Sequence, residues 1–106
     1  MSEMHLVQLL LPLHDNLQEA FPREEYSRVR RELTERFGGL TVYTRAPAEG
    51  TWRPFEEGHT SLDDIVIFEV MAAELDTDWW RTYRHELEKR FRQDVIFIRA
   101  QQTQLL

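Results

Sequence analysis

The residues that come closest to a catalytic set lie in a long polar stretch near the middle of the chain. His59 is followed by Asp63 and Asp64. An imidazole oriented by a neighbouring carboxylate can take up and release a proton near neutral pH. We therefore take His59 and Asp63 as a candidate catalytic pair for proton transfer, with Asp64 as the other acidic neighbour. A solvent-exposed histidine in a polar loop explains the same residues without any chemistry.

A second group of residues combines charged and aromatic side chains. Arg45 and Arg99 stand at equivalent positions of two similar segments, and Glu69 lies on an apolar strand between them in the sequence. A guanidinium can hold a carboxylate through two parallel hydrogen bonds, and a pocket with aromatic walls can hold a planar ligand. A structural ion pair between Glu69 and an arginine is the simpler explanation. The predicted ligand-binding residues are Tyr43, Arg45, Trp52, Glu69, Phe97 and Arg99.

Residue spacing gives no support to a metal site or a nucleotide cofactor. The chain has no cysteine, and its histidines do not form H-x-H, H-x-x-x-H or H-E-x-x-H. The motifs G-x-x-x-x-G-K-[ST], G-x-G-x-x-G and G-x-S-x-G are also missing. We therefore predict no metal and no cofactor.

The segments that must position these residues include a repeated helix-to-strand unit. The stretch 30–46 recurs as 84–100, and the positions that match are Arg30, Glu32, Leu33, Arg36, Phe37, Arg45 and Ala46 with Arg84, Glu86, Leu87, Arg90, Phe91, Arg99 and Ala100. Chance similarity between amphipathic helices is the alternative, because Glu, Arg and Leu are common helix residues. Each half also has the periodicity of a βαβ unit, so the predicted architecture holds in either case.

Periodicity predicts four strands and two helices in the order βαββαβ. The expected strands are 5–13, 40–45, 64–73 and 95–101, with 102–106 as an extension of the last. The expected helices are 22–37, stopped by Gly38-Gly39, and a second one from Asp76 or Thr77 to 92. With two right-handed crossovers, this order predicts one ferredoxin-like α+β domain over residues 1–106, with a four-stranded antiparallel sheet and both helices on one face.

Alternation along the strands assigns side chains to two faces of this sheet. The face toward the helices should carry Val7, Leu9, Leu11, Val42, Val66, Phe68, Val70, Ile96 and Ile98. The opposite face should carry Leu6, Gln8, Leu10, Thr41, Tyr43, Arg45, Ile65, Ile67, Glu69, Met71, Val95, Phe97 and Arg99. Because this second face is too apolar to remain in water, we expect a second copy of the chain to cover it as a homodimer or higher homo-oligomer.

Composition limits the environment and the partners. The 106 residues are 42% hydrophobic and 30% charged, as in one globular domain. A net charge of -6 disfavours nucleic acid and anionic membranes as partners. The apolar run 6–13 is too short to span a bilayer and lacks the flanks of a signal peptide. We expect a cytoplasmic protein that binds itself and a small anionic or planar ligand.

A central segment has a recognisable pattern. It reads Arg36-Phe37-Gly38-Gly39-Leu40-Thr41-Val42, then Gly50-x-Trp52, then Gly58 and an acidic residue before Ile65-Val66-Ile67-Phe68. The pattern resembles a family of small bacterial proteins of unknown function with a ferredoxin-like fold. More distantly, the element order resembles the dimeric α+β barrel group, which includes cofactor-free monooxygenases and isomerase-like enzymes. This second resemblance is an analogy of fold alone.

Three functions stay open at this point. The leading hypothesis is a small-molecule-binding or accessory homo-oligomer that uses the open sheet face. The second is a cofactor-free enzyme of the dimeric α+β barrel type, in which His59 and Asp63 transfer a proton. The third is a purely structural interaction module, which would have side chains filling the contact between copies and no cavity.

Overall fold

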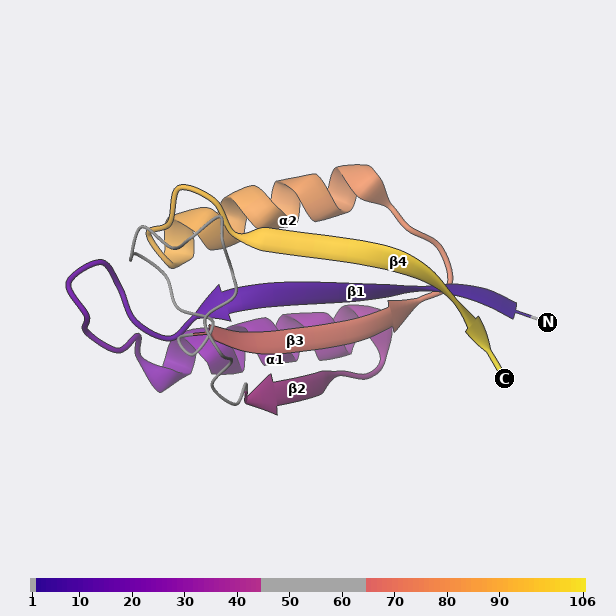
Figure 1. The fold of residues 1–106 in the computed structure, drawn as a ribbon, viewed down its shortest axis with the longest axis horizontal. Helices are drawn as coiled ribbons and strands as arrows, with labels where there is room; N and C mark the ends of the chain where they lie inside the picture. The colour runs from indigo at the N-terminus through magenta and orange to yellow at the C-terminus, as the bar shows by residue number, and fades with distance from the viewer. Residues whose placement is uncertain (1, 45–64) are drawn as a thin grey trace, which may run out of the picture.

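The computed structural model describes residues 2–44 and 65–106, which form an α+β fold with a four-stranded antiparallel sheet and two helices. The elements are β1 (Ser2–Pro12), α1 (Arg23–Phe37), β2 (Thr41–Thr44), β3 (Ile65–Ala72), α2 (Thr77–Arg90) and β4 (Phe97–Leu105). The strands lie in the order β2-β3-β1-β4, so β2 and β4 are the edges (Figure 1). This confirms the predicted sequence of elements and the antiparallel sheet.

The first strand is longer than predicted, and the last strand includes most of the predicted extension 102–106. β1 starts at Ser2 rather than at residue 5, and β4 runs to Leu105. The reason is their mutual pairing, in which Ser2 faces Leu105 and Met4 faces Thr103. The polar end of β4 has little hydrophobic alternation, so periodicity alone does not identify its partner strand. Figure 1 shows β1 and β4 running side by side to the end of the molecule that carries both termini.

The start of β4 and the end of α2 also differ from the prediction. β4 begins at Phe97 instead of Val95, because the backbone N–H of Ile96 donates to Glu88 Oε2 at 3.0 Å and not to a neighbouring strand. The second helix ends at Arg90, since Arg92 has a positive φ of 52° that an α-helix cannot contain. These local side-chain and backbone features set both boundaries.

Two helix ends follow the sequence rules. Gly38 has a left-handed φ of 82°, and its N–H donates to Thr34 O at 2.8 Å, which ends α1. At the start of α2, the Asp76 carboxylate accepts a hydrogen bond from the backbone N–H of Trp79 at 3.1 Å. The predicted glycine stop is confirmed, and of the two predicted caps, Asp76 and Thr77, the structure has Asp76.

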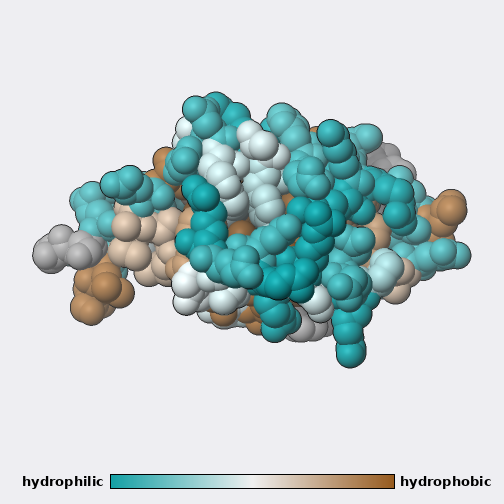
Figure 2. Space-filling view, turned by 180° about the vertical axis from the view of Figure 1, so that it is seen from behind, coloured by the Kyte–Doolittle hydropathy of each residue, from teal (hydrophilic) through white to brown (hydrophobic). Residues whose placement is uncertain are grey.

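The hydrophobic core lies between the helices and one face of the sheet. The sheet contributes Val7, Leu9, Leu11, Val66, Phe68 and Val70, and the helices contribute Val29, Leu33, Trp80, Tyr83 and Leu87. Both helices therefore cover the same face, as alternation predicted. Seen from the helix side, the outer surface is mostly hydrophilic (Figure 2). In the described part of the chain, no helix has the length and apolar character needed to cross a membrane.

Candidate functional site

A row of polar side chains crosses the sheet face that is turned away from the helices. Gln8 lies opposite Glu69 of β3 and opposite Arg99 of β4 in the strand register. Gln8 Nε2 donates to Glu69 Oε1 at 2.8 Å, and Arg99 Nε donates to Gln8 Oε1 at 2.9 Å. One amide thus links an acidic and a basic side chain on the two neighbouring strands.

Tyr43 extends this row to the edge strand β2, so that the row crosses all four strands. Its hydroxyl donates to Glu69 Oε2 at 3.2 Å. The hydrogen bond to Glu69 and the charge of that carboxylate raise the pKa of the Tyr43 phenol, because a phenolate there would face another anion. In the described residues, Glu69 accepts hydrogen bonds from Gln8 and Tyr43 and not from an arginine. We call the four side chains Tyr43, Glu69, Gln8 and Arg99 the polar row.

An apolar row lies directly beside the polar row. In the strand register Tyr43 faces Ile67, Ile67 faces Leu10, and Leu10 faces Phe97, so the row crosses all four strands. Leu10 and Ile67 in its middle are half-buried. Tyr43 and Phe97 at its two ends are 46% and 52% exposed. The open face therefore has an apolar floor between two aromatic side chains, next to a line of hydrogen-bonding groups.

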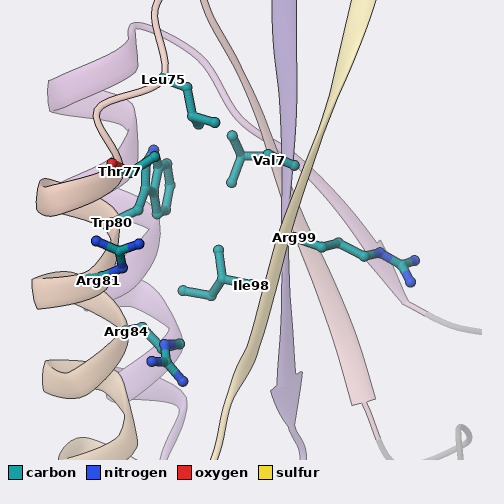
Figure 3. A pocket seen from close by; sticks show the side chains of 9 residues that line it. Val7, Leu75, Thr77, Trp80, Arg81, Arg84, Ile98 and Arg99 are labelled. Atoms are coloured by element: carbon teal, nitrogen blue, oxygen red, sulfur yellow. The ribbon is translucent and has the colours of Figure 1, made fainter.

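Arg99 is an exposed cation on this face. Figure 3 shows its side chain pointing away from α2, while Val7 and Ile98 point toward that helix. Its Nε is bonded to Gln8, which fixes the guanidinium on the sheet. Among the described residues, no hydrogen bond or ion pair occupies its Nη1 and Nη2 atoms. Two parallel donors are thus held at the border of the apolar row.

This arrangement has the chemistry needed to bind a planar anion. A carboxylate can accept two hydrogen bonds from one guanidinium, and a flat apolar body can lie on aliphatic side chains. A planar anion over Leu10 and Ile67, with its carboxylate at Arg99, would satisfy both requirements. Across residues 2–44 and 65–106, no three or more His, Cys, Asp or Glu side chains are grouped so that they could hold a metal ion.

The structure brings together some of the residues predicted from the sequence. Tyr43, Glu69, Phe97 and Arg99 share the open face, three of them in the polar row. The other predicted residues, Arg45, Trp52, His59 and Asp63, lie outside the described residues. The ligand-binding prediction thus has a defined geometry for four residues, while the catalytic pair stays a prediction.

Gln8 is the member of the polar row that the sequence prediction missed. It was placed on the correct face but not in the site, although its amide joins Glu69 to Arg99. The signal was present in the sequence, because Gln8 interrupts the apolar run from Leu6 to Leu13. A half-buried polar residue at the centre of a central strand needs hydrogen-bond partners, and side chains of the neighbouring strands lie close enough to supply them.

Comparison of the chain with protein-family models, with curated protein sequences and with solved structures finds no match.

Proposed function

We propose that the protein is a small-molecule-binding homo-oligomer whose open sheet face holds a small planar anion. Arg99 would bind the carboxylate of the ligand, and Tyr43 and Phe97 would contact its ring. Gln8 and Glu69 would position the two polar ends of the row. The observation that carries the proposal is the guanidinium of Arg99, which Gln8 fixes at Nε and which points away from α2, beside the half-buried apolar floor of Leu10 and Ile67.

The proposed homo-oligomer follows from the same face. Met71 and Phe97 are 37% and 52% exposed. Met71 lies beside Leu6 on one side of the polar row, and Phe97 lies beside Leu10 and Ile67 on the other side. Exposed apolar surface on both sides of a short polar row is typical of contact sites in soluble proteins. The face also carries both a cation and an anion, so a two-fold axis could bring opposite charges of two copies together. A second copy of the chain is therefore the proposed cover, with the ligand between the copies.

We infer a ferredoxin-like arrangement for the fold. The support is the βαββαβ order, the strand order β2-β3-β1-β4 and the placement of both helices on one face. Membership of the small bacterial family and a cytoplasmic setting are proposals that rest on the sequence. The dimeric-barrel enzyme is the competing proposal. Its proposed catalytic residues, His59 and Asp63, lie outside the described residues, so no contact of theirs supports it.

The test is the thermal response of the protein to a panel of planar carboxylates such as benzoate, salicylate and indole acetate. At least one of these probes should raise the melting temperature of the wild-type chain. The rise should vanish in Arg99→Ala and should also vanish in Arg45→Ala if that residue completes the site. Arg30→Ala, which removes an exposed arginine from α1, is the matched control and should respond like wild type. A normal response of Arg99→Ala would exclude this site.

A further inference from the structure

A groove runs between α2 and β4 on the helix side of the sheet, opposite the polar row. Its volume is about 190 Å³, and its apolar lining consists of Val7, Leu75, Trp80, Ile98 and Ala100. Figure 3 shows the side chains of Val7, Leu75 and Ile98 directed into the space beside α2. The groove is thus an apolar surface bordered by a helix and by an edge strand.

The edge strand offers backbone groups along this groove. β4 is the last strand of the sheet, and no described strand pairs with its outer side. Ala100 and Gln102, which alternation places on the helix side of β4, are exposed. Figure 1 shows α2 running beside the outer edge of β4 rather than behind the centre of the sheet. A strand added here could pair with β4 and direct every second side chain into the groove.

Two arginines of α2 line the groove, and its described lining includes no acidic residue. Arg81 and Arg84 both line it and lie three residues apart, on the same side of the helix. The Arg81 side chain is 70% exposed, and its Nη1 lies 3.6 Å from Asp78 Oδ1. Arg84 Nη1 contacts Glu88 Oε2 at 3.3 Å, an oxygen that also accepts the backbone N–H of Ile96. Each guanidinium therefore keeps donors that a carboxylate from outside can use.

We propose that this groove binds an extended segment of a partner protein, which adds to the sheet as a strand beside β4. The segment would place alternate apolar side chains on the groove lining and one carboxylate at Arg81 and Arg84. A second copy of the chain fits less well. Two-fold pairing of β4 with itself would bring the arginine-bearing helices of both copies together. In addition, the helix-side residues Ile98, Ala100 and Gln102 of β4 include no carboxylate.

The probe is a displayed library of random nonapeptides selected against the full chain. Enriched peptides should share apolar residues at alternate positions and one acidic residue in the same register. Binding of the best peptide should shift the amide NMR signals of residues 98–103 and slow their hydrogen exchange. Changing the acidic residue of the peptide to its amide should weaken binding by about tenfold or more, because a charge-assisted contact is lost.

Variants of the chain separate this site from others. The double variant Arg81→Gln and Arg84→Gln should weaken binding by about tenfold or more, whereas the matched double variant Arg30→Gln and Arg31→Gln on α1 should bind like wild type. Arg99→Ala, which alters the opposite face, should also bind normally, so failure here and failure of the proposed function are distinguishable. Enriched peptides without the alternating pattern, or shifts away from β4, would overturn the proposal. The proposal would also be overturned if the amides of β4 were protected from hydrogen exchange in the free protein and lost this protection on dilution. A second copy of the chain would then occupy the edge of β4.

Discussion

Arg90 of α2 holds Glu32 of α1 through two parallel hydrogen bonds, from Nη1 to Oε1 at 2.8 Å and from Nη2 to Oε2 at 2.9 Å. The Tyr83 hydroxyl also donates to Glu32 Oε1 at 2.8 Å, and Arg90 Nε donates to Glu86 at 3.1 Å. The Arg90 side chain is only 9% exposed. This network joins the two helices above the core and positions the layer that supports the open sheet face.

Replacement of Arg90 by leucine should lower the free energy of unfolding by about 2 kcal/mol. The change leaves Glu32 without its two-pronged partner, and loss of one member of a largely buried pair is costly, although the partial exposure of Glu32 reduces the effect. Urea unfolding followed by circular dichroism measures this change. Arg30→Leu, at an exposed position of α1, is the control and should stay within about 0.5 kcal/mol of wild type. Equal effects of the two variants would contradict the assigned role of the network.

The same network should make stability depend on acid pH through Glu32. Burial alone would raise the pKa of this carboxyl, but hydrogen bonds from Arg90 and Tyr83 and the charges of Arg90 and Arg28 outweigh burial and lower it. A lowered folded pKa gives stability above the unfolded value of about 4.3, and this stability is lost as the pH falls through the folded value. Glu32→Gln should therefore lose less stability than wild type between neutral pH and this acid range.

The measurement is the urea midpoint of wild type and Glu32→Gln at neutral pH and at acid pH. Glu35→Gln, an exposed carboxyl on the same helix, serves as the control and should keep the acid dependence of wild type. An identical acid loss in wild type and Glu32→Gln would show that another group carries the pH dependence.

The adjacent glycines after α1 should respond differently to alanine. Gly38 has a φ of 82°, where a side chain is strained, so Gly38→Ala should destabilise the protein by about 1 kcal/mol. A Cβ at Gly39 would meet no atom within 4 Å, and its φ is not in the left-handed region. Gly39→Ala should therefore be neutral or slightly stabilising, because it restricts the unfolded chain. Thermal unfolding of both variants tests this difference, and a reversed order would contradict the helix end described here.

The polar row makes a prediction about the Tyr43 phenol. Its pKa is raised by the hydrogen bond to Glu69 and by the charge of that carboxylate. Glu69→Gln removes the negative charge, so the pKa of Tyr43 should fall toward its ordinary value. Titration of ¹³C-labelled tyrosine by NMR measures the shift, with Tyr43→Phe to assign the signal. The titration of Tyr26, whose pKa burial raises to about 12, should not change and provides an internal control. An unchanged pKa of Tyr43 in Glu69→Gln would contradict the hydrogen bond between Tyr43 and Glu69 in solution.

The layers of the fold could be predicted because hydrophobic period and side-chain packing agree. Val29 and Leu33 of α1 and Leu87 of α2 fall at helical spacing and face the core, and Gly38 ends α1. The matching leucines of the repeat, Leu33 and Leu87, are both fully buried, so the repeat reflects equivalent core positions. The predictions that were wrong concern element boundaries that depend on particular polar contacts. One example is the hydrogen bond from Ile96 N–H to Glu88, after which β4 begins at Phe97.

The candidate site was predictable only in part. Alternation placed Tyr43, Glu69 and Arg99 on one face, but alternation gives no strand register. The register puts Gln8 between Glu69 and Arg99, so that its side-chain amide can contact both of them. The sequence also does not show that Glu69 binds Tyr43 and Gln8, because such contacts depend on side-chain conformations across three strands.

Native mass spectrometry of freshly purified protein tests the central proposal, namely that a second copy covers the open sheet face, most directly. The account predicts a dimer or a higher multiple of the 12.8 kDa chain that retains a small ligand. Leu10→Lys, which puts a charge in the middle of the apolar row, should convert this assembly to monomer and release the ligand. A wild-type monomer of 12.8 kDa without ligand at micromolar concentration, or an assembly that Leu10→Lys leaves intact, would contradict the account.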